Sequence, residues 1–510
     1  MKRSFRQSMS WLHTYAGLLF GWILYFIFIT GTTGYLDTEI DRWMRPEAPA
    51  ANFSVSLQTV AKHAKTYLDT HAPGARRQVI GLPLDRNQPY TSVFWQGAQG
   101  EGVEPRGHAL LNPETGETIQ ARETGAGQLL YRMHWNLHYL PSLAGHWLVG
   151  LATMVMLLAL VTGIIVHKKI FADFFTFRRK KGARSWLDAH TLVSVATLPF
   201  QLMITYSGLI FMMLTYMPLI TMAWYGQGQE SRQMFFDEVY EAPALVQASG
   251  ESAPLVSLNV VIAQAQRLWN EAPIAVLDMI HPNDRNARIV VRGNLANGPL
   301  RATHVLVFDG VSGKLLAQQP ALHSNAKGFN DVMQGLHEGL FADPVLRILY
   351  VLSGLLGAAM VATGLVLWTV KRRQKLEKLQ GKSGPGLRLV EKLNVGVVVG
   401  LPIAICAYFW ANRLLPVSMP GRADWEVHVM FLTWLTMLIH AAFRSTKRAW
   451  AEQFGMASLM FGLLPVLNVA TTDRHLGRSL AAHDWVFAGF DLTVLAMGLL
   501  FGWFAWRIKP

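Results

Sequence analysis

The sequence predicts an α-helical integral membrane protein with about eight transmembrane helices and small α+β modules between them. Of its 510 residues, 51% are hydrophobic and only 15% are charged, and the apolar residues fall in runs long enough to cross a bilayer. Lys and Arg concentrate in short segments beside these runs, as the positive-inside rule expects. The net charge of +13 therefore reflects membrane topology, and we expect a lipid bilayer and no nucleic acid as partner.

The first apolar run, residues 11–36, is predicted to be a retained transmembrane helix. It follows Lys2, Arg3 and Arg6, so its start resembles a signal peptide. However, the run is longer than a signal-peptide core, and no A-x-A cleavage site precedes the charged segment EIDRWMR.

The remaining boundaries follow from hydropathy and charge. With both termini in the cytoplasm, the basic segments lie inside and the two long polar segments lie outside, which in a bacterial inner membrane means the periplasm. The shortest predicted span covers residues 455–470. The predicted parts are helix 1 (1–36), module 1 (37–142), helices 2 and 3 (143–214), module 2 (215–343), helix 4 (344–370), a basic loop (371–393) and a four-helix tail (394–510).

Both polar segments have the same internal pattern. Each opens with a helical periodicity, VSLQTVAKHAKTYL in the first and VSLNVVIAQAQRLW in the second. Alternating strand patterns follow and end in the turn-rich stretches LLNPETGETI and LVFDGVSGKLL. We therefore expect two related α+β modules.

The helices around the modules also repeat. His13 stands 17 residues before Thr30, and His190 stands 17 residues before Ser207. His138 and His337 likewise precede Thr-Gly pairs, by 24 and 26 residues. The chain is predicted to contain two parallel repeats of helix, module and helix, related by a pseudo-two-fold axis along the membrane normal.

Such an axis pairs His13 with His190 near the inner surface and His138 with His337 near the outer one. Two facing imidazoles can supply both axial ligands of a haem, which suits electron transfer. The lone cysteine, Cys406, excludes a CxxCH attachment site. We therefore expect two non-covalent haem b groups with bis-histidine ligation, one near each surface.

Other histidines leave alternatives open. His134 is four residues from His138 on the same helical face, but Met333 occupies its equivalent position in the second copy. It is a rival ligand to His138, a supporting group or a ligand of another centre. His167 is a further candidate that has no partner in the second copy, and any single helix-end histidine is commonly interfacial.

The motifs LHTYAGLLFGW, GHWLVGLA, WLDAHT and GLHEGLFADPVLRILYVLSGL resemble the PepSY-associated transmembrane family over residues 1 to about 375. The resemblance implies that the outer modules are PepSY domains. It also implies an activity similar to that of haem-containing reductases that release iron from ferric siderophores. The haem ligands would then be His13, His190, His138 and His337. The chain departs from the family in the additional histidine of MHWNLHY and in its long tail.

The expected function is therefore dihaem electron transfer from the cytoplasmic side to a ferric siderophore. No GxGxxG motif follows a strand, so the donor would be quinol or a cytoplasmic reductase. Two alternatives are a metal or siderophore permease, which parallel repeats also suit, and a PepSY-type regulatory membrane protein without redox activity.

Overall fold

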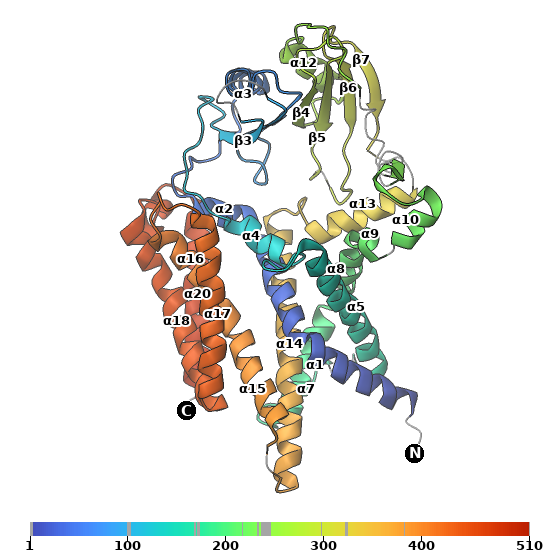
Figure 1. Ribbon diagram of the computed structural model, residues 1–510. Coiled ribbons are helices and arrows are strands. Elements are labelled where there is room, and N and C mark those ends of the chain that lie inside the picture. The colour runs from blue at the N-terminus through green and yellow to red at the C-terminus, as the bar shows by residue number, and fades with distance from the viewer. Residues whose placement is uncertain are drawn as a thin grey trace. The chain divides into compact units, whose positions relative to one another are not determined.

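The computed structural model divides the chain into two compact units (Figure 1). The helical unit comprises Met1–Pro46, Arg122–Tyr216 and Ala342–Pro510, and the sheet unit comprises Glu47–Ala121 and Met217–Phe341. The structure describes residues 4–508 except 99–103, 168–169, 171–173, 217, 232–233, 236–245, 297, 322–324 and 382.

The first part of the helical unit is built from long apolar helices. Ser4 and Gln7 form a capping box that starts α1, and the Asp343 side chain caps α14. Helices α7 and α8 meet at Thr197 with a bend of 67°, where Pro199 cannot donate a backbone hydrogen bond. Helix α1 packs along α5 and α14, and α7 packs on α14. The bounds are α1 Phe5–Gly34, α5 Ser142–Val166, α7 Ala183–Ala196, α8 Leu198–Phe211, α9 Met213–Tyr216 and α14 Pro344–Lys378.

The tail forms the second part of the helical unit. Its central helix pair, α15 and α16, is largely buried among the other tail helices and α1. The Tyr25 hydroxyl of α1 donates to the Val398 carbonyl at 2.9 Å, and Phe26 stacks on Trp434 with ring centroids 5.5 Å apart. The bounds are α15 Pro385–Val398, α16 Gly400–Leu414, α17 Arg422–Phe443, α18 Thr446–Thr471, α19 Leu476–Ala481 and α20 Trp485–Ile508.

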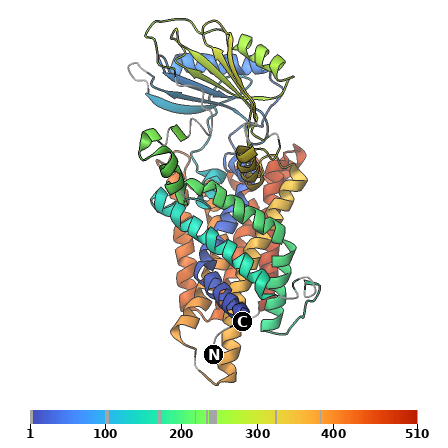
Figure 2. The same cartoon turned by 90° about the vertical axis from the view of Figure 1, so that its right-hand side faces the viewer.

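The number of candidate membrane spans agrees with the sequence prediction. Among the described residues, seven helices are long and apolar enough to cross a bilayer, or eight if the bent pair α7–α8 is one span. The predicted span at 455–470 is too short, because α18 runs over 26 residues from Thr446. Polar residues in its first turns, including Lys447 and Glu452, lower the local hydropathy, so the apolar run begins later than the helix. The N-terminal end of α1 and the C-terminal end of α20 lie at the same end of the helical unit (Figures 1 and 2).

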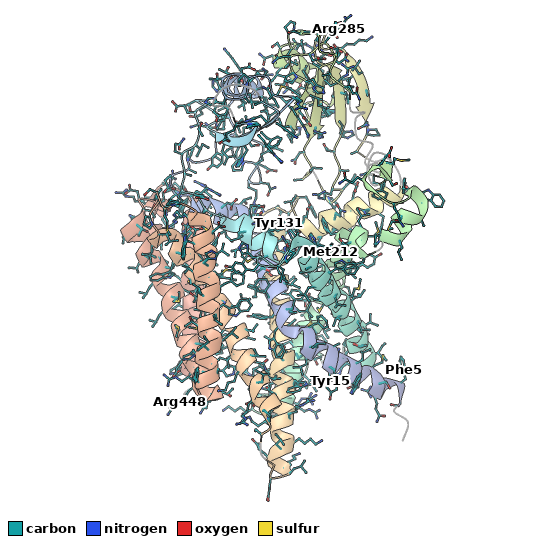
Figure 3. The ribbon with its side chains drawn as sticks, viewed as in Figure 1. Phe5, Tyr15, Tyr131, Met212, Arg285 and Arg448 are labelled. Carbon is teal, nitrogen blue, oxygen red and sulfur yellow. The ribbon has the colours of Figure 1, made fainter. Side chains whose placement is uncertain are left out.

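Two short helices that the sequence analysis assigned to module 1 belong to the helical unit. These are α2 (Asp37–Met44) and α4 (Ala126–Met133). Trp43 and Met44 are fully buried in a core that they share with tail side chains. Tyr131, labelled in Figure 3, packs on α1 at Gly34, where a Cβ would lie 2.9 Å from the tyrosine ring. The boundary between module 1 and the helical unit therefore depends on which side chains are buried together in the fold.

The sheet unit contains one antiparallel sheet of seven strands in the order β3-β2-β1-β4-β5-β6-β7. The predicted modules contribute three and four strands, and they join where β1 pairs with β4. Helices α3 and α12 pack on one face over a common apolar core (Figure 2). The bounds are β1 Arg77–Gly81, β2 Thr91–Gln96, β3 Arg106–Leu111, β4 Ile274–Ile280, β5 Arg288–Gly293, β6 Val305–Asp309, β7 Leu315–Gln319, α3 Leu57–His71, α10 Pro218–Tyr225, α12 Leu258–Leu268 and α13 Asn325–Glu338.

An ionic cluster fastens the seam between β1 and β4. The Asp278 carboxylate is 1% exposed and accepts hydrogen bonds from Arg77 at 2.9 and 2.7 Å and from Arg292 at 2.9 Å. Burial alone would raise the pKa of Asp278, but the hydrogen bonds from the two arginines outweigh it and hold the pKa below its ordinary value.

We expect Asp278→Asn to weaken this seam by about 1–3 kcal/mol, because the buried carboxylate is replaced by a poorer acceptor. Hydrogen exchange of β1 and β4 amides at neutral pH should become faster. Since the folded pKa lies below the unfolded one, the stabilisation is complete above the ordinary carboxyl pKa and is lost as pH falls through the folded value. Glu251→Gln is the matched control, because its ion pair with Arg285 is exposed; equal effects of the two variants would contradict the prediction.

Candidate functional site

The structure brings His13 of α1 and His190 of α7 together inside the helical unit. Their ring centroids are 6.3 Å apart and the ring planes make an angle of 67°. Both imidazoles are partly buried. The spacing of the repeat predicts this pairing of His13 with His190, and we call the two residues the inner histidine pair.

Each of the two imidazoles is oriented by the helix behind it. His13 Nδ1 lies 2.9 Å from the Ala159 carbonyl oxygen of α5, and His190 Nδ1 lies 2.9 Å from the Met360 carbonyl oxygen of α14. A carbonyl only accepts hydrogen bonds, so each Nδ1 donates its proton. The lone pair of each neutral ring is therefore on Nε2, where a metal can be bound.

A threonine and a glycine complete the same arrangement on both sides. The hydroxyl oxygens of Thr162 and Thr363 lie 3.3 and 3.4 Å from the respective Nδ1 atoms. A Cβ at Gly163 would lie 3.3 Å from Cε1 of His13, and one at Gly364 would lie 3.2 Å from Cε1 of His190. These glycines thus let the rings approach the helices closely.

The spacing of the two rings fits a bis-histidine haem. A metal–imidazole bond of about 2.0–2.1 Å on each side of one iron places the ring centroids roughly 6 Å apart, close to the 6.3 Å found here. The porphyrin supplies the other four nitrogens, so two imidazoles are sufficient. Among the described residues, no group of three or more His, Cys, Asp or Glu side chains could hold a bare metal ion.

An ion pair joins the segment that precedes α7 to this helix, two residues before His190. Asp188, two residues earlier, is 3% exposed and accepts from the Arg178 backbone N–H at 2.9 Å and from Arg178 Nε and Nη2 at 2.8 and 2.6 Å. Such bidentate contacts fix geometry as well as charge. They anchor the segment that enters α7.

His134, like the inner histidines, contacts a backbone carbonyl through Nδ1, but this carbonyl lies three residues earlier in the chain. Its Nδ1 donates to the Tyr131 carbonyl, which again leaves the lone pair on Nε2. The side chain lies on α1 at Gly31, where a Cβ would be 3.6 Å from the imidazole. Burial lowers the pKa of His134 to about 4, so the ring is neutral at physiological pH, as a metal ligand must be.

His138 instead faces the tail. Its ring stacks on Phe431 of α17 with centroids 6.2 Å apart and meets Tyr139 edge to face at 4.7 Å. Burial and the nearby charge of Arg132 lower its pKa. It remains partly exposed.

The structure leaves the predicted outer pair untested. His337 lies on α13 in the sheet unit, so its pairing with a histidine of the helical unit stays a prediction. His167, the further candidate, is the C-cap residue of α5, and its backbone N–H donates to the Gly163 carbonyl.

The sequence also allows a second alignment of the two copies around His134. His134 and Leu137 have the spacing His-x-x-Leu, and so do His337 and Leu340. Aligning this spacing, instead of the Leu-His dipeptide, makes His134 the equivalent of His337. With this alignment, no histidine of the second copy is equivalent to His138.

These features define a multi-pass helical membrane protein with a preorganised pair of histidines between its helices. The chain belongs to the PepSY-associated transmembrane family, because the family model described as "PepSY-associated TM region" matches residues 10–371. It is also similar to "Uncharacterized protein PA4219" of Pseudomonas aeruginosa, with 23% identity over 397 residues that cover 74% of this chain and 94% of the relative. The tail lies beyond the region that the family model matches.

Proposed function

We propose that this protein binds two haem b groups and conducts electrons across a bacterial inner membrane to a ferric siderophore. The main support is the His13–His190 pair, because its ring separation and its Nε2 lone pairs would suit a bis-histidine haem site. In this proposal both termini are cytoplasmic and the sheet unit is periplasmic, as the basic flanking segments favour.

The matching surroundings of the two inner histidines support a parallel repeat. His13 and His190 each use a carbonyl, a threonine and a glycine of the following membrane helix in the same order. A repeat with an inner pair predicts an outer pair. We assign the outer pair to His134 and His337, in preference to His138. As in the inner histidines, Nδ1 of His134 donates to a carbonyl and the side chain packs against a glycine of a membrane helix, here Gly31.

Along α1, His13 and Gly31 are 18 residues apart, which corresponds to roughly 27 Å. The two proposed sites therefore lie near opposite ends of the span. Haem bound at both sites would supply one-electron transfer between the two surfaces. The protein residues hold the ring planes, fix the imidazole tautomers and keep water away from the sites.

The proposed acceptor is a ferric chelate. Siderophores bind iron through hard oxygen ligands that favour the ferric ion, so adding one electron to the iron weakens the complex and allows ferrous iron to leave. The donor is quinol or a cytoplasmic protein, because the part of the chain that the structure describes contains no nucleotide-binding fold.

The proposal is tested by the visible spectrum of the purified protein. We expect a Soret band that shifts on dithionite reduction, with sharp α and β bands and two haems per chain. Adding a ferric siderophore to the reduced protein should restore the oxidised spectrum as a ferrous chelator traps iron. A protein without haem, after expression with ample haem supply, would refute the proposal.

The assignment of the outer ligand has its own test. His134→Ala is expected to remove about half of the haem, whereas His138→Ala should remove little, because His134 lies against α1 and His138 stacks on Phe431 of α17. Haem content is measured as the pyridine haemochrome. The opposite result would restore His138 as the ligand.

A further inference from the structure

We infer that a small acidic electron-transfer protein docks on a basic surface next to the inner histidine pair. This inference rests on the proposed function and names the class of its electron donor. The basic surface consists of residues 179–184 and the C-terminal end of α14, residues 371–378.

The two segments of the basic surface lie side by side. Gly182, with a φ of +55°, packs against the side chain of Gln374 so closely that a Cβ there would collide with it. Arg178 fixes the start of the first segment through its hydrogen bonds to Asp188. The two segments therefore form one surface.

The surface begins close to the histidine pair. Gly364, which contacts His190, and Lys371 are seven residues apart on α14, or roughly 10 Å along the helix. The C-terminal end of α14 projects past the neighbouring helices, at the same end of the helical unit as the start of α1 and the end of α20 (Figures 1 and 2).

The charge of this surface is strongly one-sided. Exposed side chains include Lys180, Lys181, Lys375 and Lys378, and Glu377 is the single acidic residue within the two segments. Clustered charge of one sign accelerates encounter with an oppositely charged partner and orients it. A donor docked here would release one electron to the cofactor between His13 and His190 and would itself be oxidised by one electron, with no bond made or broken.

The test measures docking apart from electron transfer. The protein is placed in nanodiscs of zwitterionic lipid, and the Kd of an oxidised flavodoxin, a small acidic carrier, is measured by microscale thermophoresis at low and high salt. Lys181→Gln/Lys375→Gln should raise the Kd about three- to tenfold and flatten its salt dependence. The matched control is Lys447→Gln/Arg448→Gln, which removes two exposed charges from the start of α18; Arg448 is labelled in Figure 3.

The outcomes separate this inference from the proposed function. An unchanged Kd in the Lys181/Lys375 variant, or an equal change in the control, would refute the docking surface. The basic residues would then be assigned to binding lipid headgroups. Absence of haem together with charge-dependent docking would overturn the proposed function alone. Intact haem, a raised Kd and slower reduction by reduced flavodoxin in the Lys181/Lys375 variant would support both.

Discussion

His190→Ala is expected to remove about half of the haem that the proposed function assigns to this protein, because a bis-histidine site that loses one of its two ligands would hold haem weakly. The remaining ring, His13, keeps its hydrogen bond to Ala159. It cannot supply the second ligand, because the two ring centroids are 6.3 Å apart in the unaltered protein. Haem content and the reduced α band measure the loss. Added imidazole should partly restore the spectrum, since it can fill the space that the side chain vacated.

Two further variants make this prediction specific. The double variant His13→Ala/His190→Ala should lose no more haem than either single variant, because both side chains serve one site. His71→Ala is the control: His71 is exposed on α3 and bonds only to its own helix at Tyr67, among the contacts described. Additive losses from His13 and His190 would mean that the two rings serve different sites.

Much of the helical unit could be predicted from the sequence because hydropathy responds to contact with lipid. The inner pair could also be predicted, since two copies with a histidine 17 residues before a small-residue pair should fold alike. The structure shows the same neighbours around His13 and His190. A local pattern that occurs twice is thus a strong guide to a shared geometry.

The features that were missed depend on contacts between distant residues. Helix α2 has a mixed composition, and its place in the helical unit is set by Trp43, whose Nε1 donates to Asp491 at 3.1 Å. The joining of β1 to β4 likewise depends on strands about 200 residues apart. The different surroundings of His134, which lies against α1, and His138, which stacks on α17, also depend on such contacts.

The tail is tied to the family region by buried charges. Arg422 and Glu426 on α17 are both fully buried and form an ion pair. Asn412 Nδ2 donates to Glu426 at 2.8 Å, and Arg422 donates to the Glu123 carbonyl at 2.8 Å. Thr124 also donates to Glu426, which extends the network to the segment before α4. The tail is therefore built into the fold of the helical unit.

Glu426→Ala should destabilise the helical unit by about 3–5 kcal/mol, because it leaves the Arg422 guanidinium buried without its counter-charge. The apparent melting temperature in detergent should fall clearly, and the purified protein should aggregate earlier on heating.

Glu452→Ala is the matched control for Glu426→Ala. Glu452 is also a tail glutamate, but it pairs with Arg444 where both side chains are substantially exposed, so its loss should cost less than about 1 kcal/mol. Replacing Arg422 and Glu426 together by Met and Leu should recover much of the stability lost in Glu426→Ala, since no unpaired charge then remains buried. If Glu426→Ala and Glu452→Ala melted alike, the buried network would not be what fastens the tail, and the apolar contacts of α1 with α15 and α17 would have to suffice.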